Sequence, residues 1–336
     1  MKTIALFNHK AGVGKTTLAF HLAWMLHQLG ERVLAVDLDP QAHLTAAFLE
    51  DNDGEALWDK HPAATVYGAV QPLLARLGDL REPALRTIAD GLTLIAGDLA
   101  LATFEERLAE TWPRCLDDNP SSAADAFRVT TAFHRIVARG ARVQAATVAI
   151  LDIGPSLGAL SRAALVAADY VVVPLAADQF SLRGLRDLGP TLAAWRAGWQ
   201  ERRDRPGAPA GPEMPEGTMT PLGYVVLQHA ARKASESGRA YSRWIDRLPE
   251  AFHASILQDA VPADDDPYRL ALLRHFRSLL PMALEARKPI FDLTAADGAI
   301  GSHAMTVRDA RAAFETLAKK IGAATGVGQW SSTSSA

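Results

Sequence analysis

The eight residues from Lys10 to Thr17 read Lys-Ala-Gly-Val-Gly-Lys-Thr-Thr and lie between two apolar segments of different character. Before them, Thr3–Phe7 is a short run typical of a buried strand, and after them Leu18–Leu29 has the spacing of a helix. A glycine-rich turn that joins a strand to a helix and ends in Gly-Lys-Thr places backbone N–H groups around a phosphate. This order therefore favours a phosphate-binding loop at the edge of an α/β sheet over a chance turn.

The residue types in this loop predict a nucleotide site. We expect Lys15 to contact the β- and γ-phosphates of ATP and the Thr16 hydroxyl to bind Mg²⁺. Because the glycines let backbone N–H groups turn inward, the whole loop is the candidate site. Its members are Lys10, Ala11, Gly12, Val13, Gly14, Lys15, Thr16 and Thr17.

Acidic residues follow two further apolar runs. Asp37 and Asp39 lie at the end of Arg32–Asp37, and Asp152 lies at the end of Thr147–Asp152. The carboxyl ends of parallel strands face the crevice in which ligands bind. We expect Asp39 to orient or deprotonate the attacking water, Asp37 to support Mg²⁺ through a water, and Asp152 to join the magnesium shell. Solvated turns are the alternative, which the meeting of three strand ends at one edge disfavours.

The first half of the chain alternates Val-, Ile- and Leu-rich runs with longer helical patterns, as in a parallel sheet covered by helices. We predict an α/β fold with a single doubly wound, mostly parallel sheet, helices on both faces and a helix-rich C-terminal part. The predicted strands are Thr3–Phe7, Arg32–Asp37, Leu92–Ala96, Thr147–Asp152, Tyr170–Leu175 and Leu222–Leu227. The predicted helices are Thr16–Leu29, Ala64–Leu77, Ala124–Arg139, Gly158–Ala167 and Leu182–Trp199.

Changes in composition divide the rest of the chain. One P-loop domain is expected to span residues 1–321, and residues 206–217, dense in Pro and Gly, predict a flexible loop insertion. The segment Ala230–Ala286 is expected to be rich in helices. Residues 322–336, rich in Gly, Ser and Thr, predict a disordered tail.

Composition also limits the classes of protein that fit. The chain has 336 residues, a formal net charge of −3 and one cysteine, Cys115. One cysteine excludes a disulfide framework within the chain and the paired thiolates of an iron–sulfur carrier. The chain has no apolar run of about 20 residues and no signal peptide before the loop. We therefore expect a cytoplasmic protein without a membrane partner.

Several segments together resemble the ParA/MinD family of dimerising ATPases, and most closely its partition and positioning branch. Residues 10–16 resemble the family's deviant phosphate loop, residues 37–41 its first switch and residues 152–158 its second switch. Further similar segments are Gly91–Gly97, Val173-Pro174, Phe180–Leu185 and Ala286–Ile290. The resemblance covers nearly the whole chain and implies a slow, Mg²⁺-dependent ATPase.

In that family the first lysine of the loop reaches the ATP of a second subunit. The resemblance therefore gives Lys10 a role in trans and implies an ATP-dependent homodimer, for which a long, mobile cation is well suited. It also implies that Gln228 and Pro262 frame the adenine. Two residues depart from the family pattern. Ala11 replaces a glycine, which predicts slower hydrolysis or tighter nucleotide binding, and Gly154 replaces a proline, which predicts a more flexible second switch.

The function favoured by these features is a switch that partitions or positions a cargo, with catalytic residues Lys10, Lys15 and Asp39. In this switch we expect ATP to drive dimerisation, the dimer to bind nonspecific DNA or another scaffold, and an unidentified partner protein to stimulate hydrolysis. If the dimer binds DNA, we expect the protein to be nucleoid-associated. Binding to DNA phosphates needs cations, and the candidates are Arg232, Lys233, Arg239, Arg243, Arg247, Arg274, Arg277, Lys319 and Lys320. Arginines on solvated helix faces are the alternative.

Other classes fit less well. A membrane-associated ATPase of the MinD kind needs an amphipathic C-terminal helix, which the composition of residues 322–336 does not predict. A small-molecule ligase of this fold fits the Asp-Pro-Gln sequence poorly. An ATP-binding sensor subunit with little turnover stays open as the main rival. His9 and His43 have no metal-ligand spacing, and we expect both to be structural.

Overall fold

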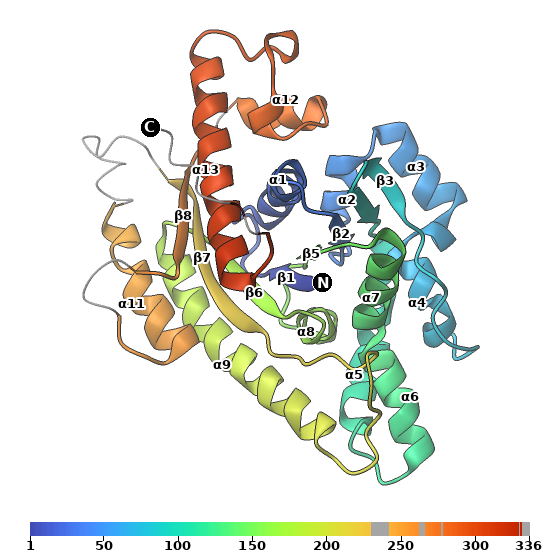
Figure 1. Ribbon diagram of the computed structural model, residues 1–336. Helices are drawn as coiled ribbons and strands as arrows, with labels where there is room; N and C mark the ends of the chain where they lie inside the picture. The colour runs from blue at the N-terminus through green and yellow to red at the C-terminus, as the bar shows by residue number, and fades with distance from the viewer. Residues whose placement is uncertain (230–241, 262–265, 277, 329, 331–336) are drawn as a thin grey trace.

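The computed structural model describes residues 1–229, 242–261, 266–276, 278–328 and 330. Within these residues, eight strands form one sheet in the order β3-β4-β2-β5-β1-β6-β7-β8. Figure 1 shows the sheet at the centre of the molecule, with helices on both sides. The predicted fold, a single doubly wound and mostly parallel sheet, is confirmed.

The strands are short and rich in Val, Ile and Leu, because the central ones are buried on both faces. Neighbouring strands are parallel except for β3, which pairs antiparallel with β4 at one edge. The bounds are β1 Lys2–Leu6, β2 Val33–Asp37, β3 Arg86–Ala89, β4 Leu92–Ile95, β5 Val148–Asp152, β6 Tyr170–Ala176, β7 Thr220–His229 and β8 Arg269–Arg274.

Helices connect these strands. Their bounds are α1 Lys15–Gln28, α2 His43–Phe48, α3 Asp51–Lys60, α4 Val66–Leu74, α5 Phe104–Arg114, α6 Pro120–Thr130, α7 Ala132–Gln144, α8 Ala159–Val166, α9 Gln179–Arg203, α11 Leu248–Phe252, α12 Leu279–Glu285 and α13 Ser302–Thr325. Short 3₁₀ turns are η1 Pro62–Ala64, η2 Leu99–Thr103, η4 Ile290–Asp292 and η5 Ala295–Asp297, and η3 His253–Leu257 is a π-helical turn.

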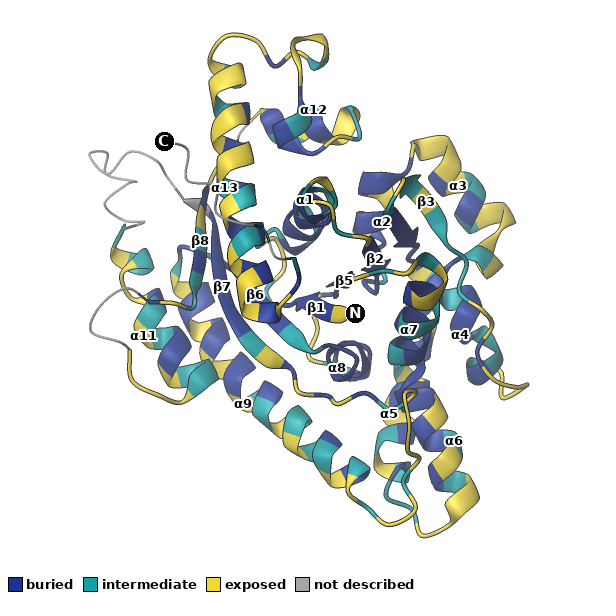
Figure 2. Cartoon of the chain, viewed as in Figure 1, coloured by how far each residue is buried: buried dark blue, intermediate teal, exposed yellow. Residues whose placement is uncertain are grey.

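The helices form two layers. Apolar side chains of α1, α2, α12 and α13 pack in one core on one face of the sheet, and those of α4 to α9 pack in a second core on the other face. Figure 2 shows that most of these helices turn a buried side toward the sheet and an exposed side outward. None of the helices in the described part of the chain is long and apolar enough to cross a membrane.

The sheet places the functional segments at one edge. Since β1, β2, β5 and β6 run parallel, their carboxyl ends meet on the same side of the sheet. The glycine-rich loop follows β1, and Asp37 and Asp152, the last residues of β2 and β5, are paired neighbours in the register. The predicted convergence of three strand ends is therefore present.

The C-terminal end differs from the prediction of a disordered tail that begins at Gly322. Helix α13 continues to Thr325 and ends where Gly326 adopts a positive φ of 73°. Gly322 lets the chain fold back tightly, because a Cβ there would lie 2.3 Å from the Trp330 ring. The Trp330 indole donates to the Leu29 carbonyl over 2.9 Å. The prediction was wrong for residues 322–328 and 330, and residues 329 and 331–336 lie outside the described part.

The segment expected to be rich in helices also contains strand β8, which pairs with β7. Its sequence, Arg-Leu-Ala-Leu-Leu-Arg, suits a helix as well as a strand, so pairing with the sheet decides its structure. Residues 206–217 connect α9 to β7 as predicted, and the Trp199 indole donates to the Pro215 carbonyl within this connection. The flexibility of this loop stays a prediction.

Candidate nucleotide site

The loop between β1 and α1 has the backbone of a phosphate cradle. Gly12 and Gly14 have φ values of +73° and +84°, a conformation in which other residues are strained. A Cβ on Gly14 would also lie 3.0 Å from the Leu227 side chain. Ala11 does not have a positive φ, so its methyl group adds no strain of this kind to the loop.

This loop borders a pocket of about 300 Å³. The pocket brings the loop together with the first switch, the start of α2 and the second switch. Backbone N–H groups, a lysine and a carboxylate therefore face one space, as a phosphate chain with a cation requires. The lining residues are Ala11, Gly12, Gly14, Lys15, Thr16, Thr17, Asp39, Gln41, His43 and Pro155.

Lys15 lines this pocket and is only 6% exposed. Burial lowers the pKa of Lys15, while the nearby carboxylates of Asp152 and Asp39 raise it. A buried ammonium group gains stability when further negative charge arrives beside it. The environment of Lys15 therefore favours binding of an anion such as a phosphate.

Thr16 and Asp152 form the candidate metal position. The Thr16 hydroxyl donates to Asp152 Oδ2 over 2.7 Å. Asp152 is fully buried, and its Oδ1 has no hydrogen-bond partner within the described part of the chain. Burial raises the pKa of Asp152 well above its ordinary value, and neighbouring Asp37 adds to the rise. A hydroxyl beside a buried carboxylate with an unpartnered oxygen fits a hard divalent cation such as Mg²⁺.

Asp37 is also fully buried, but its oxygens bond within the protein. Its Oδ2 accepts from the backbone N–H and the hydroxyl of Thr45 over 2.8 Å and 2.7 Å, and its Oδ1 accepts from the Asp39 N–H over 3.2 Å. Burial raises the pKa of Asp37 to about 7, although the Thr45 bonds lower it. Asp37 therefore braces the first switch, and its support of Mg²⁺ through a water stays a prediction.

Asp39, in the first switch, lies against the second switch. Its Oδ1 accepts from the Gln41 N–H over 2.9 Å and thereby fixes the turn that leads to α2. A Cβ on Gly154 would lie 3.1 Å from this oxygen and 3.5 Å from Pro40. Gly154 does not have a positive φ, so close approach to Asp39 explains the glycine better than backbone freedom does.

Lys10 is the first residue of the phosphate loop, and its side chain is held by its own chain. Its ammonium group forms an ion pair with Asp178 and lies 5.7 Å from the centre of the Phe180 ring. Asp178 also caps α9, since its Oδ1 accepts from the Ser181 N–H over 2.8 Å. Burial favours a higher pKa for Asp178, but the bonds from Lys10 and Ser181 outweigh this effect and lower the pKa.

The predicted adenine contacts fall at the border of the described residues. Pro262 lies outside them, and Gln228 has a place in β7 while its side chain lies outside the description. Both roles stay predictions.

Of the predicted DNA-binding residues in the described part of the chain, two lie beside an aromatic ring and two form ion pairs. Arg243 and Arg247 lie 4.9 Å and 5.5 Å from the Trp244 ring. Arg274 and Lys319 form ion pairs with acidic neighbours in α13. The candidates outside the described residues are Arg232, Lys233, Arg239 and Arg277.

Sequence patterns missed several residues that complete the site. His43, expected to be structural, lines the pocket beside Gln41. Thr45, which holds Asp37 and also accepts from the Gly97 N–H over 2.7 Å, follows no motif that predicts its role. Asp178 has a weak signal, because the Asp-x-x-Ser spacing before a helix is typical of a cap.

Comparison with known proteins places this geometry in a family. A family model described as an AAA domain matches residues 1–201. The chain is 31% identical over 202 residues to the chromosome partitioning protein ParA of Caulobacter vibrioides. It is 33% identical over 204 residues to the chromosome-partitioning ATPase Soj of Thermus thermophilus. The chain belongs to the ParA/MinD family of P-loop ATPases.

The ParA and Soj alignments each cover 60% of this chain and 66% of the relative, slightly less than two thirds of the relative's length. The similarity to solved structures with this fold covers a larger share of the chain. An ATP complex of a Cyanothece McdA variant has a TM-score of 0.63, with 19% identity over 98% of each chain. Cobyrinic acid a,c-diamide synthase of Mycobacterium smegmatis with bound ADP and magnesium has a TM-score of 0.52 and 26% identity, covering 74% of this chain and 82% of that chain.

Proposed function

We propose that this chain is an ATP-dependent switch that partitions or positions a cargo. The proposal is supported by the relatives ParA and Soj, whose names describe chromosome partitioning. The observation that carries the proposal is the pocket lined by Lys15, Thr16 and Asp39, with Asp152 bonded to Thr16. The solved structures with ATP, or with ADP and magnesium, support ATP and Mg²⁺ as the ligands.

Each group has a part in this reaction. Thr16 and Asp152 hold Mg²⁺, which neutralises charge on the β- and γ-phosphates when it is bound. Lys15 and the loop N–H groups orient the phosphate chain. Asp39 orients the attacking water and accepts its proton, and the products are ADP and phosphate. The position of Asp39 in the pocket, against the second switch, supports this role.

The proposal includes an ATP-dependent dimer formed over the carboxyl edge of the sheet. Three large apolar side chains that follow strands at this edge are exposed, namely Leu99 at the start of η2 at 67%, Leu157 in the second switch at 40% and Phe180 at the start of α9 at 71%. Exposed apolar groups gathered near a ligand site favour burial against another protein surface. Lys10 lies beside Phe180, and in the dimer it leaves Asp178 and reaches the ATP of the partner subunit.

Nonspecific DNA and an activating protein are the proposed partners. Arg243 and Arg247, each close to the Trp244 ring, support contact with a polyanion because cations beside an aromatic ring suit nucleic acid. The protein is then located in the cytoplasm, on the nucleoid.

Light scattering coupled to size exclusion, with ATP turnover measured in parallel, tests this function. The unchanged chain is expected to dimerise with ATP and Mg²⁺ and to hydrolyse ATP slowly, below the usual range of about 1 to 10³ per second. Lys15→Ala removes nucleotide binding. Lys10→Ala still binds ATP but stays monomeric, and Asp39→Ala forms a dimer that persists. Lys60→Ala, at an exposed position, is the matched control.

Three outcomes contradict parts of this proposal. Fast hydrolysis that needs neither DNA nor a partner refutes the switch. An Asp39→Ala variant that stays monomeric with ATP refutes the prediction that this substitution traps the ATP-bound dimer. Tight ATP binding with no turnover in the presence of DNA favours the sensor subunit instead.

A further inference from the structure

Glu105, on α5, bonds to the first turn of α8 from outside that helix. Its Oε1 accepts from the Ala159 N–H over 2.5 Å, and its Oε2 accepts from the Leu160 N–H over 2.8 Å. The first N–H groups of a helix have no partner within it, and a carboxylate stabilises that positive end. Gly158, at the N-cap position, has no side chain to satisfy them. Glu105 therefore supplies the cap that the N-cap residue of α8 cannot provide.

The glycine at position 158 serves this contact. Its backbone angles, φ −91° and ψ −171°, are open to any residue. A Cβ at this position would lie 2.4 Å from Glu105 Oε1. A side chain at the last residue of the second switch would therefore displace the Glu105 carboxylate, although the backbone conformation would accept it.

The capped first turn of α8 contacts the second switch, which precedes it in the chain. Ser161, buried in this turn, has its hydroxyl 2.9 Å from the Ser156 hydroxyl and donates to the Gly154 carbonyl over 3.4 Å. Gly154 in turn packs against Asp39, and Pro155 lines the pocket. The position of the α8 terminus therefore sets where the second switch meets the first.

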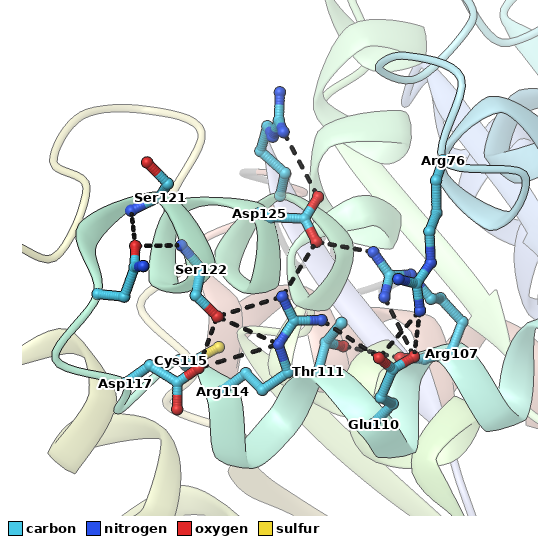
Figure 3. A network of polar contacts seen from close by, with 12 residues as sticks. Arg76, Arg107, Glu110, Thr111, Arg114, Cys115, Asp117, Ser121, Ser122 and Asp125 are labelled. Atoms are coloured by element: carbon cyan, nitrogen blue, oxygen red, sulfur yellow. Dashed lines mark hydrogen bonds and ion pairs between the residues drawn. The ribbon is translucent and has the colours of Figure 1, made fainter.

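Helix α5 is a firm support for this cap. Two residues after Glu105, the buried guanidinium of Arg107 bonds to Glu110 over 3.1 Å and to Asp125 of α6 over 2.7 Å. Figure 3 shows these groups, with Arg114 and Ser122, as one network that joins α5 to α6. The network holds the backbone that positions Glu105.

We propose that Glu105 is a positioning residue for ATP hydrolysis. By capping α8, Glu105 holds Gly154 and Pro155 against Asp39, and this contact aligns the attacking water with the γ-phosphate. The proposal rests on the proposed ATPase function. It predicts that loss of the cap lowers turnover while ATP binding, which depends on the phosphate loop, changes little.

Glu105→Ala is compared with Glu106→Ala, whose exposed carboxylate has no bonding partner in the described residues. In Glu105→Ala we expect kcat to fall about tenfold or more, with the Kd for ATP within about twofold. Amide hydrogen exchange at Ala159 and Leu160 rises about tenfold or more. Glu106→Ala changes neither quantity. Faster exchange with an unchanged kcat, well below the melting temperature, overturns the proposal and leaves a purely structural cap.

A second pair of variants tests the mechanism of the effect. Gly158→Ala is expected to lower kcat in the unchanged background, because its Cβ displaces the carboxylate. Added to Glu105→Ala, the same change alters kcat by less than about twofold, since the clash is gone. Additive losses overturn the proposal. Where Glu105→Ala does not fold, Glu105→Gln replaces it in the comparison with Glu106→Ala, with one N–H still accepted and an intermediate loss expected.

Failure of the proposed ATPase function can be distinguished from failure of the positioning role of Glu105. A chain that binds ATP without turnover refutes the ATPase, but the exchange of residues 153–158 with and without ATP still tests Glu105. An ATP-dependent change in exchange that persists in Glu105→Ala overturns the positioning role. A change that is lost in Glu105→Ala but kept in Glu106→Ala supports it.

Discussion

Asp37 and Asp152 occupy equivalent places at the ends of paired strands, yet their surroundings give them different chemistry. Both are fully buried, and burial raises the pKa of each. Asp37 has both oxygens in hydrogen bonds to Thr45 and Asp39, whereas Asp152 keeps one oxygen without a partner in the described residues. The free oxygen of Asp152 is the one that suits a cation.

His21 shows how one side chain joins distant segments. Its Nδ1 lies 2.7 Å from the Thr17 carbonyl, and its Nε2 accepts from the Ile290 N–H over 3.0 Å. Because Nε2 accepts, Nδ1 carries the proton and the ring is neutral. Burial lowers the pKa of His21 to about 4, against the raising effect of the Thr17 carbonyl. The segment near Ile290 is thereby held against α1.

The pH dependence of stability tests this environment. Between about pH 6.5 and pH 4, His21 binds a proton in the unfolded chain but not in the native state. The free energy of unfolding therefore falls with decreasing pH. From pH 7.5 to pH 4.5 this residue is expected to remove about 2 to 3 kcal/mol. His21→Gln keeps an acceptor but does not titrate. In urea titrations, the stability difference between the two proteins therefore shrinks or reverses at pH 4.5. A difference that is constant with pH contradicts the assignment.

At the level of elements, α9 depends on an unusually close contact. A Cβ on Gly189 would lie 1.8 Å from the Ser255 carbonyl oxygen of η3. The backbones of the two elements therefore touch, and Pro190 follows at once within the helix. Glycine costs helix stability, but here it permits packing that no other residue allows.

Gly189→Ala is expected to lower the free energy of unfolding by at least about 2 kcal/mol, because the methyl group forces α9 and η3 apart. Gly198→Ala, in the same helix, is the control. Its Cβ would lie 3.2 Å from the Trp112 ring, and the gain in helix propensity keeps the change within about 1 kcal/mol. Urea denaturation followed by circular dichroism measures both. Equal losses in the two variants refute the close contact as the cause.

Elements with strong periodic patterns were predictable, and elements defined by their neighbours were not. The expected helix Ala124–Arg139 is two helices, because Thr131 leaves helical geometry and its hydroxyl bonds back to the Phe127 carbonyl. Strand β8 takes its structure from pairing with β7. The periodic pattern of the local sequence predicts neither the bond of Thr131 nor the pairing of β8.

At the level of the whole molecule, the ion pair between Lys10 and Asp178 opposes the proposed dimer. Asp178 follows β6, so the pair joins two strand ends and holds Lys10 within its own subunit. A half-exposed ion pair of this kind contributes at most about 1 kcal/mol. The chain can therefore release Lys10 at small cost when ATP and a second subunit offer more negative charge.

Asp178→Asn removes the charge of this partner and keeps an oxygen to cap α9. Half-maximal dimerisation is expected at about two- to fivefold lower ATP concentration, since each subunit no longer breaks an ion pair. Light scattering over an ATP titration measures this shift. Asp187→Asn, on the same helix, is the control. A shift to higher ATP concentration means that Asp178 supports the dimer instead.

The order of runs and motifs along the chain was enough to predict the parallel sheet, the phosphate loop, and the placing of Asp37, Asp39 and Asp152 at one edge. These features follow from local periodicity and from the rule that parallel strands end on the same side. The tertiary structure alone distinguished a free carboxylate oxygen on Asp152 from a saturated Asp37, paired Lys10 with Asp178 and brought Glu105 to α8. Such contacts join residues far apart in the chain, and packing determines them because desolvation and reach are properties of the folded molecule.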